Sequence, residues 1–275
     1  MASFREGILK DVLAEFDRVL PGKGLEAHPF KIQWYNDKVS DSFKLPYNGD
    51  TLAVLIISAP KMFEELLKPF ILGGKYKREG FNALKDEENE RKEEGGSDPL
   101  DQCFRDVFNK LQTHFSQYKT TFIQDYELHH NRRPKILLQT AGHVSGSAYY
   151  YQRGDVPRAP WGEDKPIYGV SVHPRYGGWF AFRGVLIFED IRVKGEELEY
   201  KDPIDCVSKR EKRIELLEEF NYHWEEWRYR DILDGGDVED RYSEEQKEYF
   251  GTLPKDRHKL VQKWREREGE EDVRS

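Results

Sequence analysis

Several stretches of the chain carry apolar residues at helical spacing. Within residues 4–20 and 98–115, apolar side chains recur three or four positions apart, which is typical of amphipathic helices. Cys103 lies on the apolar stripe of the second stretch, so we interpret it as a packed thiol rather than a nucleophile. Similar patterns predict further helices at 208–232, 243–250 and 254–268, and one that starts near residue 60.

A different pattern predicts the strands. Residues 51–58 (TLAVLIIS) are apolar at nearly every position, which indicates a strand buried on both faces. Shorter runs predict strands at 120–127, 135–140, 167–173 and 178–190. This order is neither strict β-α-β alternation nor all-β. We therefore expect an α+β fold with a central, mainly antiparallel sheet flanked by helices.

The chain has 275 residues, enough to bury a substantial core. We expect a single domain over 1–275, with a charged surface insertion at about 74–99 and a C-terminal helical segment at about 241–268. Ser243 and Gln246 predict a capping box in that segment, with the hydroxyl and the amide each satisfying one backbone N–H.

Charge and composition exclude some classes of protein. A formal net charge of −8 argues against a dedicated binder of nucleic acid or anionic membranes, and the basic run at 129–135 is interpreted as an exposed turn before a strand. The longest apolar run, 52–57, is far shorter than the ~20 residues of a membrane helix, and the N-terminus does not resemble a secretory signal. Two distant cysteines, Cys103 and Cys206, favour a reducing compartment, so we expect a cytoplasmic protein.

Motifs for catalysis by the chain's own side chains are missing from the sequence. His129 and His130 are adjacent, but there is no H-x-x-x-H, C-x-x-C, G-x-S-x-G, G-x-G-x-x-G or P-loop. We therefore expect no metal held by protein ligands and no catalytic side chain. An enzyme of this sequence would take its reactive group from a cofactor or cosubstrate.

Two arginines fall among aromatic residues. Alternation within 178–190 puts Arg183 on the strand face of Trp179, with Phe182 on the opposite face, so Arg183 is either an anion receptor or a residue that extends its charge to solvent. Arg230 ends an aromatic stripe of a helix predicted over 214–233, where core packing is the alternative to anion binding.

The segment HVSGSAYYYQR (143–153) combines two kinds of residue. Small residues around His143 allow close approach by another element or by a large planar ligand. The three tyrosines at 149–151 and Gln152 then offer ring faces, hydroxyl groups and an amide. Such a surface suits a macrocycle rimmed with amides.

Five blocks of the sequence resemble the CblC-type (MMACHC) family of cobalamin-processing and trafficking proteins. The resemblance runs from about residue 25 to about residue 257. Its strongest blocks are HPFKIQWYN (28–36), DYELHHNRRPKILLQTAGHVSGSAYYYQR (125–153), HPRYGGWFAFRG (173–184), FNYHWEEWRYRD (220–231) and RYSEEQKEYF (241–250).

The resemblance implies a nitroreductase- or flavin-reductase-like fold that holds cobalamin with its lower base detached. It implies removal of the upper axial ligand, by glutathione-dependent dealkylation of alkylcobalamins and by reductive decyanation of cyanocobalamin with electrons from FMN or FAD. It also implies hand-over of the product to a CblD-type protein that serves methionine synthase. The resemblance is also compatible with a ligand-induced homodimer. A carrier without chemistry and a generic flavin reductase are the alternative functions that the sequence leaves open.

Site residues follow by position from the resemblance. Glutathione is expected at Arg183, Arg230 and Arg257. His143 belongs to the cobalamin set, but Ala141 stands where an orienting aspartate would precede a cobalt-binding histidine, so we expect His143 to shape the pocket and not to ligate cobalt. The full set for cobalamin is Asp125, Ile136, Leu137, Leu138, Gln139, His143, Tyr150, Tyr151, Gln152, Ser171 and Phe182.

Overall fold

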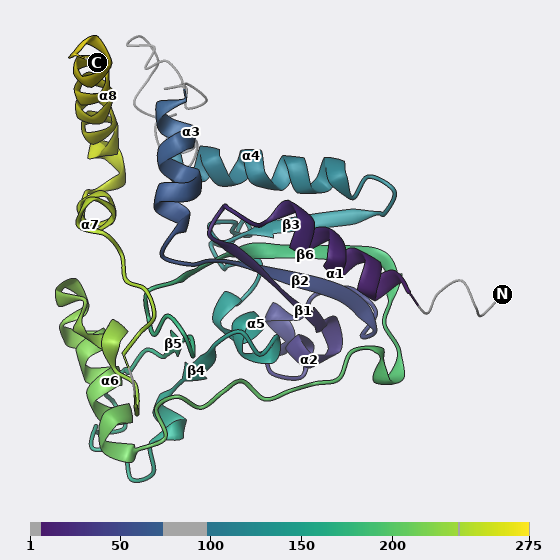
Figure 1. Cartoon of the computed structure of the whole chain (residues 1–275). Helices are drawn as coiled ribbons and strands as arrows, with labels where there is room; N and C mark the ends of the chain where they lie inside the picture. The colour runs from purple at the N-terminus through teal and green to yellow at the C-terminus, as the bar shows by residue number, and fades with distance from the viewer. Residues whose placement is uncertain (1–6, 74–97, 236, 275) are drawn as a thin grey trace. The chain divides into compact units, whose positions relative to one another are not determined.

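The structure is a computed structural model that describes residues 7–73, 98–235 and 237–274 (Figure 1). Its contacts divide the chain into two compact units. The first holds residues 1–21, 25–60 and 116–241, and the second holds 22–24, 61–115 and 242–275. The predicted insertion lies outside the described residues except for Asp98 and Pro99, which begin a helix. A single domain over 1–275 stays a prediction.

The first unit is built on a four-stranded antiparallel sheet. Its strands are β1 (Leu25–Lys31), β2 (Thr51–Ser58), β6 (Ala181–Arg192) and β3 (Thr120–Gln124), in that order across the sheet. Every residue of β2 is buried, because this strand pairs on both edges and is covered on both faces. The continuous apolar run of 51–58 is therefore explained, and the expected α+β fold with an antiparallel sheet is confirmed.

Helices cover both faces of this sheet. Helix α1 (Ile8–Val19) lies on one face, where the Phe16 and Phe188 rings meet edge to face at 6.4 Å. On the opposite face lie α2 (Ile32–Asn36) and α5 (Leu138–Val144), as Figure 1 shows. Their side chains share a buried apolar core with Val185 and other residues of that face.

Smaller elements complete the first unit. Strand β4 (Tyr149–Tyr151) pairs with β5 (Val170–Val172) in a separate antiparallel ribbon, and α6 (Arg210–Tyr222) follows later in the chain. Short 3₁₀ turns lie at Asp41–Phe43, Arg153–Asp155, Gly195–Glu197, Trp224–Glu226 and Arg228–Asp231.

Two predicted elements of this unit are wrong. The strand expected at 135–140 is replaced by α5, which begins at Leu138, because a short apolar run suits a buried helix as well as a buried strand. The helix expected over 208–232, with its stripe over 214–233, ends at Tyr222. Trp227 has a φ of 65°, in the left-handed region that a continuous α-helix does not enter. The run 129–135 is an exposed turn, but it precedes a helix and not a strand.

A β-bulge lies in β6 at Arg183. Ile56 of β2 pairs with Gly184 and the next residue, Ile57, pairs with Phe182, so Arg183 is the extra residue. A bulge changes the direction of the side chain that it carries. It also breaks the alternation predicted for this strand, because Phe182 and Val185 now contact the same apolar core.

The second unit is helical among its described residues. It contains a π-helical turn (Phe63–Leu67), α3 (Lys68–Leu72), α4 (Pro99–His114), α7 (Glu244–Gly251), a 3₁₀ turn (Pro254–Asp256) and α8 (Arg257–Arg274). The rings of Phe63, Tyr249 and Trp264 form its core, with centroids 5.7–6.0 Å apart. None of the described helices is both long and apolar enough to cross a bilayer.

The cap predicted for α7 is half formed. The Ser243 hydroxyl accepts a hydrogen bond from the Gln246 N–H at 3.1 Å. The Gln246 side-chain amide is buried and makes no hydrogen bond to a described residue, so the second bond of the box is missing. Cys103 is buried on α4, as its place on the apolar stripe predicts.

Candidate functional site

A cavity of about 740 Å³ lies in the first unit beside α5 and β4. Its volume falls within the range of ~300–1,000 Å³ found for small-molecule sites. Its wall comes from the start of α5, from β4, from Asp125 after β3 and from the loop that follows α2. Eight of the residues expected to contact cobalamin line it, namely Asp125, Ile136, Leu137, Leu138, Gln139, His143, Tyr150 and Gln152.

The three consecutive tyrosines of β4 have different surroundings. Tyr149 and Tyr151 are two residues apart, so they lie on one side of the strand, and their rings stack at 4.4 Å. Tyr149 and Tyr150 line the cavity. Tyr151 is fully buried, and its hydroxyl donates to Asp205 at 2.7 Å and accepts from the Val207 N–H at 2.8 Å. Tyr151 thus anchors the 205–207 loop and does not line the cavity.

Glycines allow this close packing. A Cβ atom on Gly169 would lie 2.5 Å from the Tyr150 ring and 2.7 Å from the Tyr151 carbonyl oxygen. A Cβ atom on Gly142 of α5 would lie 2.4 Å from the Phe182 ring. Phe182 therefore packs against α5 behind the cavity. Neither Phe182 nor Ser171, whose buried hydroxyl has no hydrogen bond to a described residue, lines the cavity.

His143 is held in one orientation by the backbone of β4. Its Nδ1 accepts a hydrogen bond from the Tyr150 N–H at 3.2 Å. Burial lowers the pKa of the imidazole, and the positive charge of Lys38 acts in the same direction, so the ring is neutral with its proton on Nε2. If Nε2 bound a metal, the ring proton would have to move to Nδ1. Two N–H donors, that of the ring and that of Tyr150, would then face each other.

Two further bonds position the start of α5. The Tyr35 hydroxyl of α2 accepts from the Leu137 N–H at 2.9 Å. The Gln139 amide donates to the carbonyl oxygen of Gly169 at 3.1 Å, which joins α5 to the segment before β5. Because Tyr35 is fully buried, α2 holds this wall of the cavity in place.

The bulge at Arg183 directs its guanidinium toward two polar groups. Nε donates to the Ser58 hydroxyl at 2.8 Å, and Nη1 lies 3.8 Å from Oδ2 of Asp125. The Arg183 side chain is 6% exposed, whereas that of Asp125 is 36% exposed. Partial burial raises the pKa of the Asp125 carboxyl, and the nearby Arg183 charge lowers it less.

Arg230 lies among rings, as its sequence context predicts, although the helix that predicted it is absent. Its guanidinium carbon is 4.8 Å from the Trp227 ring centroid, 5.0 Å from that of Tyr229 and 5.6 Å from that of Trp179. An Nη also donates to the Gly178 carbonyl oxygen. The Arg230 carbonyl oxygen in turn accepts from the Gly178 N–H at 2.8 Å, and this close approach explains Gly177, because a Cβ there would lie 2.2 Å from that oxygen.

Arg257 belongs to the second unit and forms a buried ion pair there. Its Nη1 lies 2.5 Å from Oδ2 of Asp98, and the two side chains are 11% and 7% exposed. Asp98 also accepts from the Tyr249 hydroxyl and from the Leu100 N–H at the start of α4. The pair therefore connects the start of α8 with the start of α4.

Comparison with known proteins identifies the family. Residues 24–261 match the family model described as the Methylmalonic aciduria and homocystinuria type C family, MMACHC. The chain belongs to the MMACHC family. A chicken relative is 48% identical over 238 residues (86% of this chain, 90% of the relative), and a zebrafish relative is 42% identical over 257 residues (93% and 94%). Both are named cyanocobalamin reductase / alkylcobalamin dealkylase.

A solved structure of the family has the same fold. It is the crystal structure of a Caenorhabditis elegans B12-trafficking protein, CblC, described as a homologue of human MMACHC. The TM-score is 0.74 at 32% sequence identity, and the match covers 93% of this chain and 96% of that one. The resemblance to the MMACHC family and the fold expected from it are therefore confirmed.

Sequence reasoning missed part of the cavity of this MMACHC chain. The loop after α2 contributes Lys38, Val39, Ser40 and Phe43, and the other missed residues are Pro134, Thr140 and Asp155. The segment DKVSDSF has no periodicity, so no pattern marks it. Tyr149 also lines the cavity, as the run of three phenols predicts, although the set carried over from the family does not include it.

A second polar cluster of the first unit groups Glu26, His28 and His173, with ligand atoms within 4.8 Å of one another. The Nδ1 of His173 accepts from the N–H groups of Arg175 and Tyr176, at 3.1 and 3.3 Å. The proton of its neutral ring therefore lies on Nε2, which faces Glu26 at 3.7 Å. The cluster is satisfied by hydrogen bonding, and a cation would have to displace that proton.

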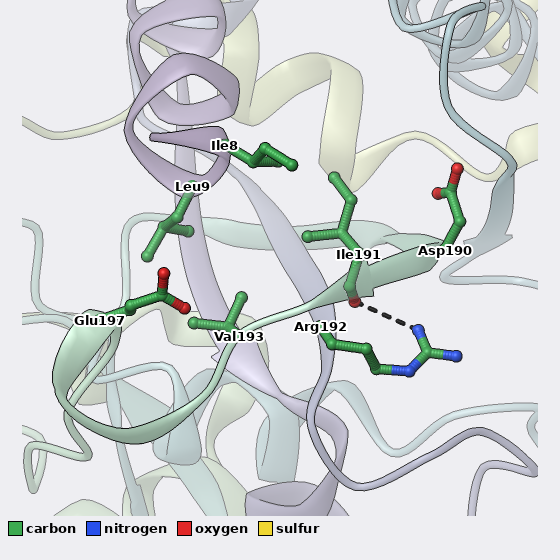
Figure 2. A pocket seen from close by; sticks show the side chains of 7 residues that line it. All are labelled: Ile8, Leu9, Asp190, Ile191, Arg192, Val193 and Glu197. Carbon is green, nitrogen blue, oxygen red and sulfur yellow. Dashed lines mark hydrogen bonds between the residues drawn. The ribbon is translucent and has the colours of Figure 1, made fainter. Parts of the chain in front are cut away.

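Figure 2 shows a much smaller hollow between α1 and the end of β6. Ile8, Leu9, Ile191 and Val193 contribute to its lining, and its volume is about 30 Å³. That is room for a water molecule and not for an organic ligand. The large cavity beside α5 and β4 is therefore the candidate ligand site.

Proposed function

We propose that the chain processes cobalamin by removing its upper axial ligand, and that the corrin ring occupies the cavity beside α5 and β4. The observation that carries this proposal is the lining of that cavity, in a chain whose relatives bear the names given above. Tyrosine rings, the Gln139 amide and the apolar side chains of α5 suit a wide ring with an amide rim.

For alkylcobalamins, the proposed cosubstrate is glutathione. Its carboxylates would pair with Arg183, Arg230 and Arg257, since guanidinium groups bind carboxylates directionally. The thiolate attacks the alkyl carbon, a sulfur–carbon bond forms, and the electron pair of the broken cobalt–carbon bond stays on cobalt as cob(I)alamin. The contribution of the chain is proximity, orientation and a site in which the lower base is detached.

The environment of the two cysteines supports a borrowed thiol. Burial raises the pKa of Cys206 to about 11, so its thiol is protonated at neutral pH. Cys103 is 1% exposed within α4. A nucleophile must be a thiolate that reaches its substrate, and neither cysteine meets both conditions.

Reductive decyanation is the second half of the proposal, with reduced FMN or FAD as the electron donor. We assign no residue to the flavin, because the cavity residues are assigned to cobalamin and the three arginines to glutathione. Hand-over of the product to a CblD-type protein in the cytoplasm completes the proposal.

Anaerobic incubation of methylcobalamin with glutathione tests the proposal. The wild-type chain should convert the methylcobalamin spectrum to that of cob(I)alamin or its oxidation products. Arg183→Ala should raise the KM for glutathione by about 10- to 100-fold, because a charge-assisted pair with its carboxylate is lost. Cobalamin should still bind to this variant. Arg175→Ala is the control, since Arg175 is 53% exposed and paired with Glu239.

Three other outcomes would contradict it. Binding of cobalamin without glutathione-dependent conversion would indicate a carrier. Flavin turnover on simple acceptors without any corrinoid affinity would indicate a flavin reductase. Equal loss of cobalamin binding and dealkylation in Arg183→Ala would indicate that Arg183 is structural.

A further inference from the structure

Two of the arginines proposed for glutathione already lie beside a carboxylate of this chain. Arg257 pairs with Asp98 at 2.5 Å in a buried contact, and Asp98 has two further donors. Removing one partner of such a buried pair is strongly destabilising, so Asp98 is a fixed partner. Arg183 and Asp125 are different, because their atoms are 3.8 Å apart and Asp125 is 36% exposed.

Three features make the Asp125 contact exchangeable. The 3.8 Å between Nη1 of Arg183 and Oδ2 of Asp125 exceeds hydrogen-bond distance, so the two groups attract through their charges without a direct hydrogen bond. The Arg183 guanidinium keeps its bond to Ser58 when the carboxylate moves, because that bond uses Nε. Asp125 lines the cavity, so a ligand there reaches its carboxylate directly.

We propose that Asp125 is an exchangeable counterion of Arg183 that turns to the corrin ring when the cavity fills, and so couples cobalamin binding to glutathione binding. The inference rests on the proposed function. Amide groups at the rim of the corrin ring are donors, and a carboxylate accepts from them. As the carboxylate turns toward the ring, its hold on Arg183 weakens, and Arg183 accepts a carboxylate of glutathione more readily. The coupling is reciprocal.

The probe is S-methylglutathione, which keeps both carboxylates and has no thiol to react. Its affinity for the full chain is measured by calorimetry with and without bound methylcobalamin. In the wild type, bound methylcobalamin should lower the dissociation constant of S-methylglutathione by about two- to fivefold, which is the size of effect expected for a partly exposed ion pair. In Asp125→Asn, binding should already be tighter without methylcobalamin, and the added gain should disappear.

Asp155→Asn is the matched control. Asp155 lines the same cavity, and its carboxylate accepts from the Gln152 N–H at 2.7 Å, but the carboxylate beside Arg183 is that of Asp125. Asp155→Asn removes one negative charge from the cavity and leaves the Arg183–Asp125 pair in place, so it should keep the wild-type gain from methylcobalamin. Asp125→Ala, which also lacks the carboxylate, should behave as Asp125→Asn does, and melting curves would verify that each variant is folded.

The proposal is overturned if Asp125→Asn keeps the wild-type gain, or if Asp155→Asn loses it equally. A wild-type affinity that methylcobalamin does not change would also overturn it. These results differ from failure of the proposed function, in which the wild-type chain neither changes the methylcobalamin spectrum nor dealkylates it with glutathione.

Discussion

Backbone N–H groups decide the protonation of two histidines. His143 and His173 both accept at Nδ1, from Tyr150 and from the turn after His173, and burial lowers the pKa of both rings. Each ring is therefore a neutral donor through Nε2. For His143, this supports the expectation that the residue shapes the pocket and is not a cobalt ligand.

Glu26 is the acceptor at the centre of the second cluster. Burial alone would raise the pKa of its carboxyl, but the nearby donor groups of His173, His28 and Tyr176 outweigh burial and hold the pKa well below its usual range. The Tyr176 hydroxyl donates at 2.7 Å, and the carboxylate is 26% exposed. Ionised Glu26 thus stabilises the contact between β1 and the turn after β5.

Glu26→Gln should lower the free energy of unfolding by about 1–3 kcal/mol near pH 7, because an amide N–H then faces donors. The folded-state pKa is lowered, so this stabilisation is fully present above the unfolded-state value of about 4.3 and is lost progressively as pH falls from there through the lower folded-state value. Urea unfolding at neutral pH and near pH 3 measures the difference between wild type and variant. A difference that does not shrink on acidification would contradict this role.

Periodicity predicts the regular elements and misses their interruptions. Strand β2 and helix α4 were found because their apolar patterns run without a break. The end of α6 was missed, because the aromatic spacing continues through Trp227 although its φ is 65°. The bulge at Arg183 was missed for a related reason, since it depends on pairing with Ile56 and Ile57 of a distant strand.

The cavity was predictable only in part, because some of its residues are brought there by contacts with distant segments. Residues assigned to cobalamin as one contiguous block, such as 136–139, line the cavity wall. Tyr151 does not line the cavity, although it lies on the same side of β4 as Tyr149, because its ring is fully buried and its hydroxyl donates to Asp205. The loop from Lys38 reaches the cavity through tertiary packing alone, which no local pattern records.

Gly169→Ala tests how closely the β4–β5 ribbon is packed. The new methyl group would meet the Tyr150 ring and the Tyr151 backbone, so it should cost about 1–3 kcal/mol and weaken cobalamin binding. Gly154→Ala is the control, because a Cβ there meets nothing within 4 Å. Binding titrations and melting curves of both variants give the comparison. Equal effects of the two substitutions would show that the Tyr150 contact is unimportant.

Among the described residues, the two units have separate cores, and only the first of these two cores borders the large cavity. The cavity and its tyrosines belong to the first unit, and the ring cluster of Phe63, Tyr249 and Trp264 belongs to the second. Arg257 lies next to that cluster, with its guanidinium carbon 4.6 Å from the Tyr249 ring centroid. Its ion pair with Asp98 therefore stabilises the second unit whether or not a ligand is bound.

Arg257→Ala should destabilise the second unit by about 3–5 kcal/mol, because it leaves the buried Asp98 carboxylate unpaired. Hydrogen exchange should accelerate in α4 and α7, while β2 and β6 stay protected. Lys263→Ala is the control, because it breaks only an exposed ion pair with Glu248 at 4.0 Å, and it should have a smaller effect. Uniform acceleration in both units would contradict this assignment.

The most direct test of the account is a titration of methylcobalamin with the purified chain, followed in the visible spectrum. Occupation of the cavity with the lower base detached predicts a saturable shift to the base-off spectrum, and Gly169→Ala should weaken it. A methylcobalamin spectrum that stays unchanged at saturating protein would contradict the assignment of this cavity to the corrin ring.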